Sequence, residues 1–149
     1  IYTEYFAEGC LYRVKAYPGI PDMLTELKDR GAKIAVLSNK PHENTENVIE
    51  RVFGKELFDL VQGQCELFPR KPAPDGALYL AQQMGVSPQE CIYAGDTGTD
   101  MQTGKAAGMY TIGVLWGFRG REELVREGAD CVIKTAAELS AIYRGGNGK

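Results

Sequence analysis

Cys91-Ile-Tyr-Ala-Gly-Asp-Thr-Gly-Thr-Asp100 passes from an apolar run through a glycine turn into the polar start of a helix. Residues 91–94 predict a short buried strand, and the small residues from about Asp100 to Ala107 predict a helix that ends at Gly108. A strand that leads at once into a helix is typical of a mostly parallel sheet covered by helices.

The same alternation of strand and helix extends to both sides of this stretch. Upstream, apolar residues recur at helical spacing before Gly31, Gly54 and Gly85, so we expect a helix to end at each glycine. The three stripes are Ile20, Leu24 and Leu27; Val48, Ile49, Val52 and Phe53; and Ala77, Leu78, Ala81 and Met84. Further strands are expected at 33–37, 58–61, 110–115 and 131–133, and further helices at 121–127 and 136–143. The predicted fold class is α/β.

Composition excludes two classes of partner. The 149 residues carry 17 Lys and Arg against 20 Asp and Glu, a net charge of −3, so no basic stripe is available to neutralise nucleic-acid phosphates. The longest apolar stretches, at 34–37 and 110–116, are far shorter than the roughly 20 residues of a membrane span. We therefore expect neither nucleic-acid nor membrane binding.

The cysteines carry no metal or redox signal. Cys10, Cys65, Cys91 and Cys131 form no C-x-x-C pair, and the chain has a single His. We expect free thiols that pack as small apolar groups in a reducing cytoplasm.

Two polar clusters follow the upstream strands. Ser38-Asn39-Lys40 comes directly after the first, where a hydroxyl and the N–H groups of a helix start can hold an anion such as phosphate. The alternative is that Ser38 or Asn39 caps the helix. Arg70 and Lys71 lie in a loop stiffened by prolines, where a fixed cation can neutralise a transferring phosphoryl group; the alternative is a solvated surface lysine.

A third cluster follows the strand at 91–94. Asp96 and Asp100, four residues apart across the glycine turn, can converge on a cation that prefers oxygen ligands, such as Mg²⁺. The alternative is a helix cap and a first-turn acid. Because ligands gather at the carboxyl ends of parallel strands, the three clusters are expected to form one site.

The order of the three clusters resembles that of the motifs of the haloacid dehalogenase-like hydrolase superfamily. Within this superfamily, the chain resembles the phosphoglycolate phosphatase-like branch. The resemblance covers residues 17 to 143, about the whole predicted core. Ser38 in Leu-Ser-Asn-Lys matches the second motif, Lys71 in Arg-Lys-Pro-Ala-Pro-Asp the third, and Asp96 with Asp100 the fourth. The resemblance implies a three-layer, Rossmann-like core with a mostly parallel sheet.

The resemblance also implies a reaction: Mg²⁺-dependent hydrolysis of a phosphomonoester through a phospho-aspartate. Ser38 and the Asn39 backbone would bind the phosphoryl group of a small phosphorylated metabolite, and Lys71 would neutralise it. Asp96 would bind the metal directly. Asp100 would hold a metal-bound water or support Lys71.

One family motif is missing. The family's first strand carries Asp-x-Asp-x-Thr, which supplies the nucleophile, but this chain has no Asp-x-Asp and begins with Ile. We expect a C-terminal portion of such an enzyme, truncated after the first strand and most of a helical cap. Residues 1–17 then belong to the tail of the cap and a linker, 18–144 to an incomplete core, and 145–149 to a disordered tail.

The missing strand lies, in this family, between the strand ending at Ser38 and the strand ending at Asp96. Its loss leaves two rows of unpaired backbone groups facing a gap. We expect the chain alone to be catalytically inactive and either poorly packed or self-associated through that gap.

Two other functions stay open from the residues. A phospho-ligand-binding or interaction module would lack a nucleophile by design. A receiver-like signalling domain also groups carboxylates and a lysine, but its phospho-acceptor aspartate should end a middle strand, and Gln62-Gly63-Gln64 follows residues 58–61 instead. His42 and Trp116 are not expected to be catalytic. The substrate is not predicted, because in this family the cap selects it.

Overall fold

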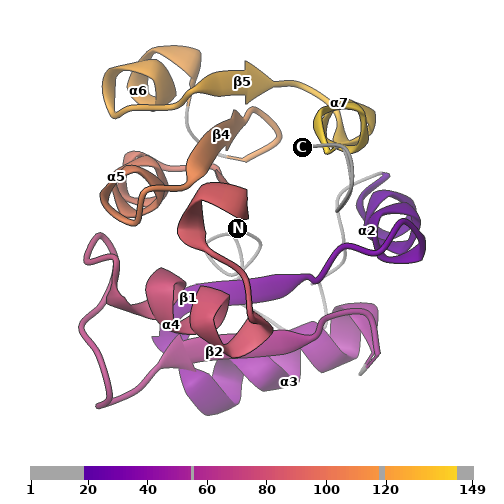
Figure 1. Cartoon of the computed structure of the whole chain (residues 1–149), viewed down its shortest axis with the longest axis vertical. Coiled ribbons are helices and arrows are strands. Elements are labelled where there is room, and N and C mark those ends of the chain that lie inside the picture. Colours follow the sequence, from indigo (N-terminus) through magenta and orange to yellow (C-terminus); the bar gives the residue numbers. More distant parts are fainter. Residues whose placement is uncertain (1–18, 55, 118–119, 144–149) are drawn as a thin grey trace.

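The computed structural model describes residues 19–54, 56–117 and 120–143. The predicted cap tail and linker (1–17) and the C-terminal tail (145–149) therefore lie outside the described residues. In chain order the elements are α2 (Ile20–Asp29), β1 (Ala35–Pro41), α3 (His42–Phe53), β2 (Leu60–Gln64), α4 (Asp75–Met84), η3 (Pro88–Glu90), β3 (Ile92–Gly95), α5 (Gly98–Ala106), β4 (Tyr110–Val114), α6 (Arg121–Arg126), β5 (Cys131–Ile133) and α7 (Ala136–Ile142). The α/β alternation is confirmed (Figure 1).

Helix positions follow the predicted apolar stripes closely. Helix α3 ends at Gly54 and α4 at Gly85, and both glycines have positive φ angles, 84° and 73°. Such left-handed backbone costs glycine little because it has no Cβ. One assignment was wrong: Leu78 is 38% exposed, whereas its neighbour Leu80 is buried. The buried face of α4 is rotated relative to the predicted apolar stripe. It consists of Gly76, Ala77, Leu80 and Ala81.

The strands are parallel, but they form two sheets rather than one. β1 pairs with β2 from Ala35–Leu60 onward, and β3, β4 and β5 form a second sheet in that order. Among the described residues, β1 and β3 each have a strand neighbour on one side only. The strands are thus divided between β1 and β3, where the missing first strand was expected to leave a gap.

The first strand is longer than expected. We predicted residues 33–37 with Ser38 just beyond, but β1 begins at Ala35 and runs to Pro41, so Ser38 lies within it. Its pairing with β2 is regular through Leu37 and shifts register before Pro41. Ser38 and Asn39 therefore lie where the regular pairing of β1 with β2 is interrupted, as at a β-bulge.

The same aspartate arrangement begins the outer strand of each sheet. Asp59 precedes β2; its Oδ2 accepts from the Ile34 amide at 2.7 Å, and its Oδ1 is 3.2 Å from Lys28 Nζ of α2. Asp130 precedes β5; its Oδ2 accepts from the Thr111 amide at 2.7 Å, and its Oδ1 is 2.9 Å from Lys105 Nζ of α5. Each carboxylate thus ties an outer strand to its inner neighbour and to the helix that precedes that inner strand.

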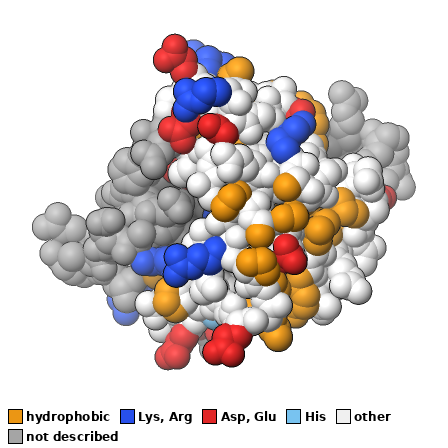
Figure 2. All heavy atoms as spheres, turned by 90° about the vertical axis from the view of Figure 1, so that its left-hand side faces the viewer, with side chains coloured by type: hydrophobic (Ala, Val, Ile, Leu, Met, Phe, Trp, Pro, Cys, Tyr) orange, Lys and Arg blue, Asp and Glu red, His pale blue; other side chains and the backbone are white. Residues whose placement is uncertain are grey.

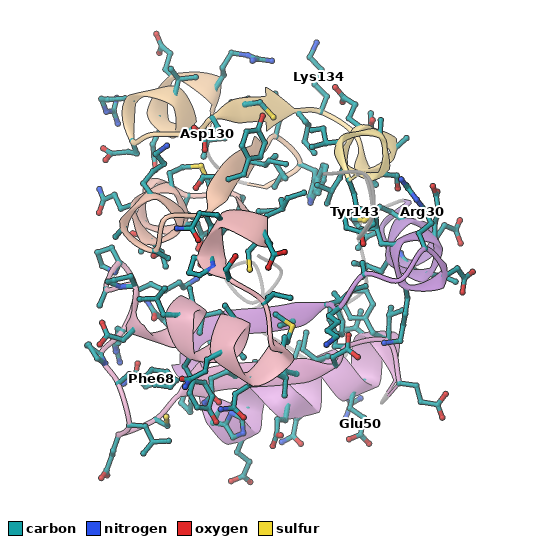
Figure 3. The ribbon with its side chains drawn as sticks, viewed as in Figure 1. Arg30, Glu50, Phe68, Asp130, Lys134 and Tyr143 are labelled. Atoms are coloured by element: carbon teal, nitrogen blue, oxygen red, sulfur yellow. The ribbon has the colours of Figure 1, made fainter. Side chains whose placement is uncertain are left out.

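Helices α2 and α7 join the two sheets on one side (Figure 3). Arg30 Nη1 donates to the Ser140 carbonyl at 2.9 Å, and Nη2 donates to the Tyr143 carbonyl at 2.6 Å. The Arg30 guanidinium also lies 5.2 Å from the centre of the Tyr143 ring. This contact holds the halves together at a distance from the predicted site.

Between the sheets lies an apolar cavity of about 400 Å³. β1 and β3 flank it, with α2 and α4 among its other walls, and Val36, Leu37, Ile92, Ala94, Met23 and Leu80 are among its lining residues. We call this cavity the inter-sheet slot. It coincides with the gap expected from the missing strand.

The surface has no dominant charge. On the face shown in Figure 2, acidic and basic side chains are interspersed, in keeping with the composition. None of the helices in the described part of the chain combines the length and hydrophobicity that crossing a membrane requires. Cys65, Cys91 and Cys131 are half-buried free thiols, as expected.

Candidate active site

Lys71 and Asp100 form the centre of the site. Lys71 lies in the loop between β2 and α4, and Asp100 lies in the first turn of α5. Lys71 Nζ is 2.7 Å from Asp100 Oδ1, and each side chain is 2% exposed. Because these residues come from opposite sides of the inter-sheet slot, their contact brings the carboxyl ends of β1 and β3 together.

The Asp100 carboxylate is charged and fully engaged. Burial raises its pKa, but the charge and hydrogen bond of the Lys71 ammonium and the hydrogen bond from the Asp96 amide are among the effects that together lower it, to about 2. Its Oδ2 accepts from the Asp96 amide at 3.1 Å, while Oδ1 faces Lys71. Of the two roles expected for Asp100, this geometry favours the support of Lys71.

Asp96 occupies the turn between β3 and α5. Its side chain is 1% exposed, and a methyl group placed on Gly117 would overlap its Oδ2. The loop after β4 thus passes directly over the Asp96 carboxylate. Only a glycine lets the backbone come this close.

Two residues that sequence reasoning did not single out hold this turn. Thr97 Oγ1 accepts from the Asp100 amide at 3.1 Å, which caps α5. Glu123 of α6 accepts from the Gly98 amide at 2.8 Å through Oε2. Thr97 carries the usual signal of a cap residue. Glu123 carries none, because its contact spans 25 residues.

Asn39 connects the first cluster to the second. Its Oδ1 accepts from the Lys71 amide at 2.9 Å, and its Nδ2 donates to the Lys71 carbonyl at 3.3 Å. We expected only the Asn39 backbone to contribute. The side chain instead fixes the backbone of Lys71 on both sides.

Ser38 is 3% exposed, and its Oγ accepts from the Lys40 amide at 3.0 Å. This bond lies within β1 and does not cap α3, whose N-cap residue is Pro41 and which has no side-chain cap, so the capping alternative for Ser38 and Asn39 was wrong. A hollow of about 10 Å³, roughly one water position, is lined by Ser38, Asn39 and Lys71 among others. The structure thus brings together all five expected residues: Ser38, Asn39, Lys71, Asp96 and Asp100.

His42 and Trp116 have structural contacts. His42 Nδ1 accepts from the Gly63 amide at 3.0 Å, and Nε2 lies 3.3 Å from Glu46 Oε2. His42 thus holds β2 to the start of α3, away from the Lys71–Asp100 pair. Trp116 lines the inter-sheet slot.

The carboxylates of the site fit the way in which proteins usually bind Mg²⁺. Within the described residues, no three His, Cys, Asp or Glu side chains gather around one point. Mg²⁺ commonly takes one or two carboxylates and keeps its other positions for water and substrate phosphate. A buried carboxylate such as Asp96, beside Asp100, suits that mode, whereas a cage made wholly of protein ligands is not present in the described residues.

Comparison with known proteins agrees with this geometry. Residues 1–114 match the model of a family described as haloacid dehalogenase-like hydrolase. The chain belongs to this family. The resemblance expected from the motifs is thereby confirmed.

Individual members are similar over part of their length. The phosphoglycolate phosphatase of Aquifex aeolicus is 33% identical over 118 residues, which are 79% of this chain and 55% of that protein. A Lactobacillus delbrueckii protein has a TM-score of 0.84 at 36% identity, covering 93% of this chain and 57% of that one. A hydrolase of the same family from Deinococcus radiodurans, solved with bound phosphate and sodium, has a TM-score of 0.80 at 28% identity, covering 87% and 59%. The chain spans about half the length of the curated relatives it matches.

Proposed function

We propose that this protein is part of a Mg²⁺-dependent hydrolase of phosphomonoesters, with phosphoglycolate as the first substrate to test. The buried Lys71–Asp100 ion pair beside Asp96 carries the proposal, because it holds a cation and carboxylates together where strands of the two sheets end. The named activity of the Aquifex aeolicus relative and the phosphate bound by the Deinococcus radiodurans relative support it.

Each side chain would have one task. The Ser38 hydroxyl would donate to a phosphoryl oxygen, and the Lys71 ammonium, oriented by Asn39 and Asp100, would neutralise the charge of the transferring group. Asp96 would hold Mg²⁺, with Asp100 near it. The metal, when bound, would supply further neutralisation of the phosphoryl oxygens.

The nucleophile is proposed to come from outside these 149 residues. A phospho-aspartate route needs a carboxylate that attacks phosphorus while the ester oxygen leaves, and water then releases phosphate and restores the carboxylate. Asp96 and Asp100 are committed to other roles, and the sequence has no Asp-x-Asp. We also propose a small phosphorylated metabolite as partner and the cytoplasm as location, which suits three free thiols.

The test compares this chain with a version extended upstream through any Asp-x-Asp-x-Thr. Hydrolysis of p-nitrophenyl phosphate is measured with Mg²⁺ and with excess EDTA. The proposal expects activity only in the extended version with Mg²⁺, lost in Asp96→Asn and kept in Asp22→Asn, an exposed acid on α2. If the extended version shows no hydrolysis while this chain binds phosphate or Mg²⁺, the result favours a phospho-ligand-binding module over an enzyme.

A further inference from the structure

We propose that Glu123 of α6 is a positioning residue for the Asp96 carboxylate, and that it sets the affinity of this carboxylate for Mg²⁺ without being a metal ligand itself. The inference rests on the proposed function, because that function assigns Asp96 to the metal. The contact that carries it is the hydrogen bond from the Gly98 amide to Glu123 Oε2, at 2.8 Å.

The turn from Asp96 to Asp100 is held by three hydrogen bonds from its amides to side-chain oxygens. The Asp96 amide donates to Asp100 Oδ2 at 3.1 Å, and the Asp100 amide donates to Thr97 Oγ1 at 3.1 Å. Both acceptors belong to the turn itself, so these two bonds fix its shape. The third acceptor, Glu123, lies on another helix. Of the three bonds, only this one therefore fixes where the turn lies.

Glu123 is itself held in place from the sheet. Its neighbour Leu124 is fully buried, and the Leu124 Cβ would lie 3.0 Å from a methyl group placed on Gly113 of β4. Gly113 is the pairing partner of Gly95, the last residue of β3, which directly precedes Asp96. The turn is therefore anchored at two points, through β3 at one end and through Glu123 at the other.

Loss of the Glu123 contact would move the Asp96 carboxylate. Gly98 is buried, so its amide would become an unsatisfied donor unless the turn shifted to reach another partner. The loop after β4 passes directly over Asp96 at Gly117, so a shift of the turn changes how the loop covers the carboxylate. Metal ligands that lose such outer support typically bind their ion about 10- to 100-fold more weakly.

The role of Glu123 requires a hydrogen-bond acceptor at Gly98. In the part of the chain that the structure describes, no three His, Cys, Asp or Glu side chains gather around one point, so Glu123 is not a third ligand beside Asp96 and Asp100. A glutamine side chain has a carbonyl oxygen that accepts the same bond without the negative charge. Glutamine should therefore replace Glu123, whereas alanine should not.

The test measures the Mg²⁺ affinity of this chain by calorimetry in matched variants. We expect Glu123→Ala to bind Mg²⁺ about tenfold more weakly than the native chain, and Glu123→Gln to stay within about twofold of it. Gln102→Ala is the control, because Gln102 Nε2 donates to Glu127 Oε1 at 2.6 Å and so joins α5 to α6 at another place. Its affinity should equal that of the native chain.

Gly98→Ala tests the same contact from the other side. A methyl group there would lie 3.0 Å from Glu123 Oε2 and 2.8 Å from Glu127 Cγ, so both side chains must move. We expect a loss of Mg²⁺ affinity like that of Glu123→Ala. The double variant should lose less than the sum of the two single losses, because both changes act through one contact. Urea titrations of the same variants should show that affinity does not follow stability.

Three results would overturn the inference. They are native Mg²⁺ affinity in Glu123→Ala, a loss in Glu123→Gln as large as in Glu123→Ala, or an equal loss in Gln102→Ala. The last result would show that α5–α6 packing in general governs the site. In all three cases the native chain binds Mg²⁺, so the proposed function stands. A native chain that does not bind Mg²⁺ would instead overturn the assignment of Asp96 to the metal, and the inference with it.

Discussion

At the scale of single residues, the buried Lys71–Asp100 pair is costly to break. Removing one partner of a buried pair leaves an uncompensated charge and costs about 3 to 5 kcal/mol. We therefore expect Lys71→Met or Asp100→Asn to lower the free energy of unfolding by that amount in urea titrations.

The exposed pair Lys28–Asp59 provides the control for this prediction. Its side chains are 36% exposed, so Lys28→Met should cost about 1 kcal/mol or less. Equal losses in Lys28→Met and Lys71→Met would show that the buried pair has no special role in stability.

Gly117 controls the position of the Asp96 carboxylate. A methyl group at this position would meet Asp96 Oδ2 and its Cγ, so Gly117→Ala must displace the carboxylate. We expect Mg²⁺ affinity, measured by calorimetry, to fall about tenfold or more, a loss of about 1.4 kcal/mol. Gly120→Ala is the matched control, because a methyl group there meets no atom within 4 Å. Unchanged affinity in Gly117→Ala would argue against Asp96 as a metal ligand.

At the scale of elements, Asp59 and Asp130 each tie an outer strand to its neighbour. Burial raises the pKa of Asp130, but the Thr111 amide and Lys105 lower it more, so the folded pKa lies below its ordinary value near 4. The stabilisation is therefore complete above the unfolded pKa and is lost as pH falls through the folded pKa.

Asp130→Asn should thus be less stable than the native chain at pH 7, by about 1 kcal/mol, and should lose less stability between pH 7 and pH 2. Urea unfolding at both pH values measures this. Glu66→Gln, an exposed loop acid, serves as control. Parallel pH profiles for Asp130→Asn and the native chain would contradict the assigned role of Asp130.

At the scale of the whole molecule, the inter-sheet slot governs the response to pressure. Unfolding removes internal voids, so a cavity of about 400 Å³ predicts a large negative unfolding volume, on the order of −100 mL/mol. Ala94→Leu partly fills the slot and should make that volume less negative in high-pressure fluorescence measurements. Ala106→Leu, on an exposed position of α5, should leave it unchanged. Identical volumes in all three proteins would mean that the slot is not a void in solution.

The sequence by itself determined the elements and the composition of the site. Apolar periodicity and glycine stops depend on neighbours within a few residues, so the helices were predicted with their ends at Gly54 and Gly85. Ser38 lies near the carboxyl end of β1, Lys71 and Asp96 follow strands, and strand ends converge in a parallel sheet. The error at Leu78 arose because adjacent apolar residues on a helix allow two orientations of the stripe.

Only the tertiary structure decided how the residues of the site are joined. The Lys71–Asp100 pair spans 29 residues, the Asn39–Lys71 contacts 32, and the Glu123–Gly98 contact 25. Contacts at such separations depend on how elements pack, which local sequence does not encode. The division between β1 and β3 was expected from the family resemblance, and the structure agrees, because among the described residues β1 pairs only with β2 and β3 only with β4.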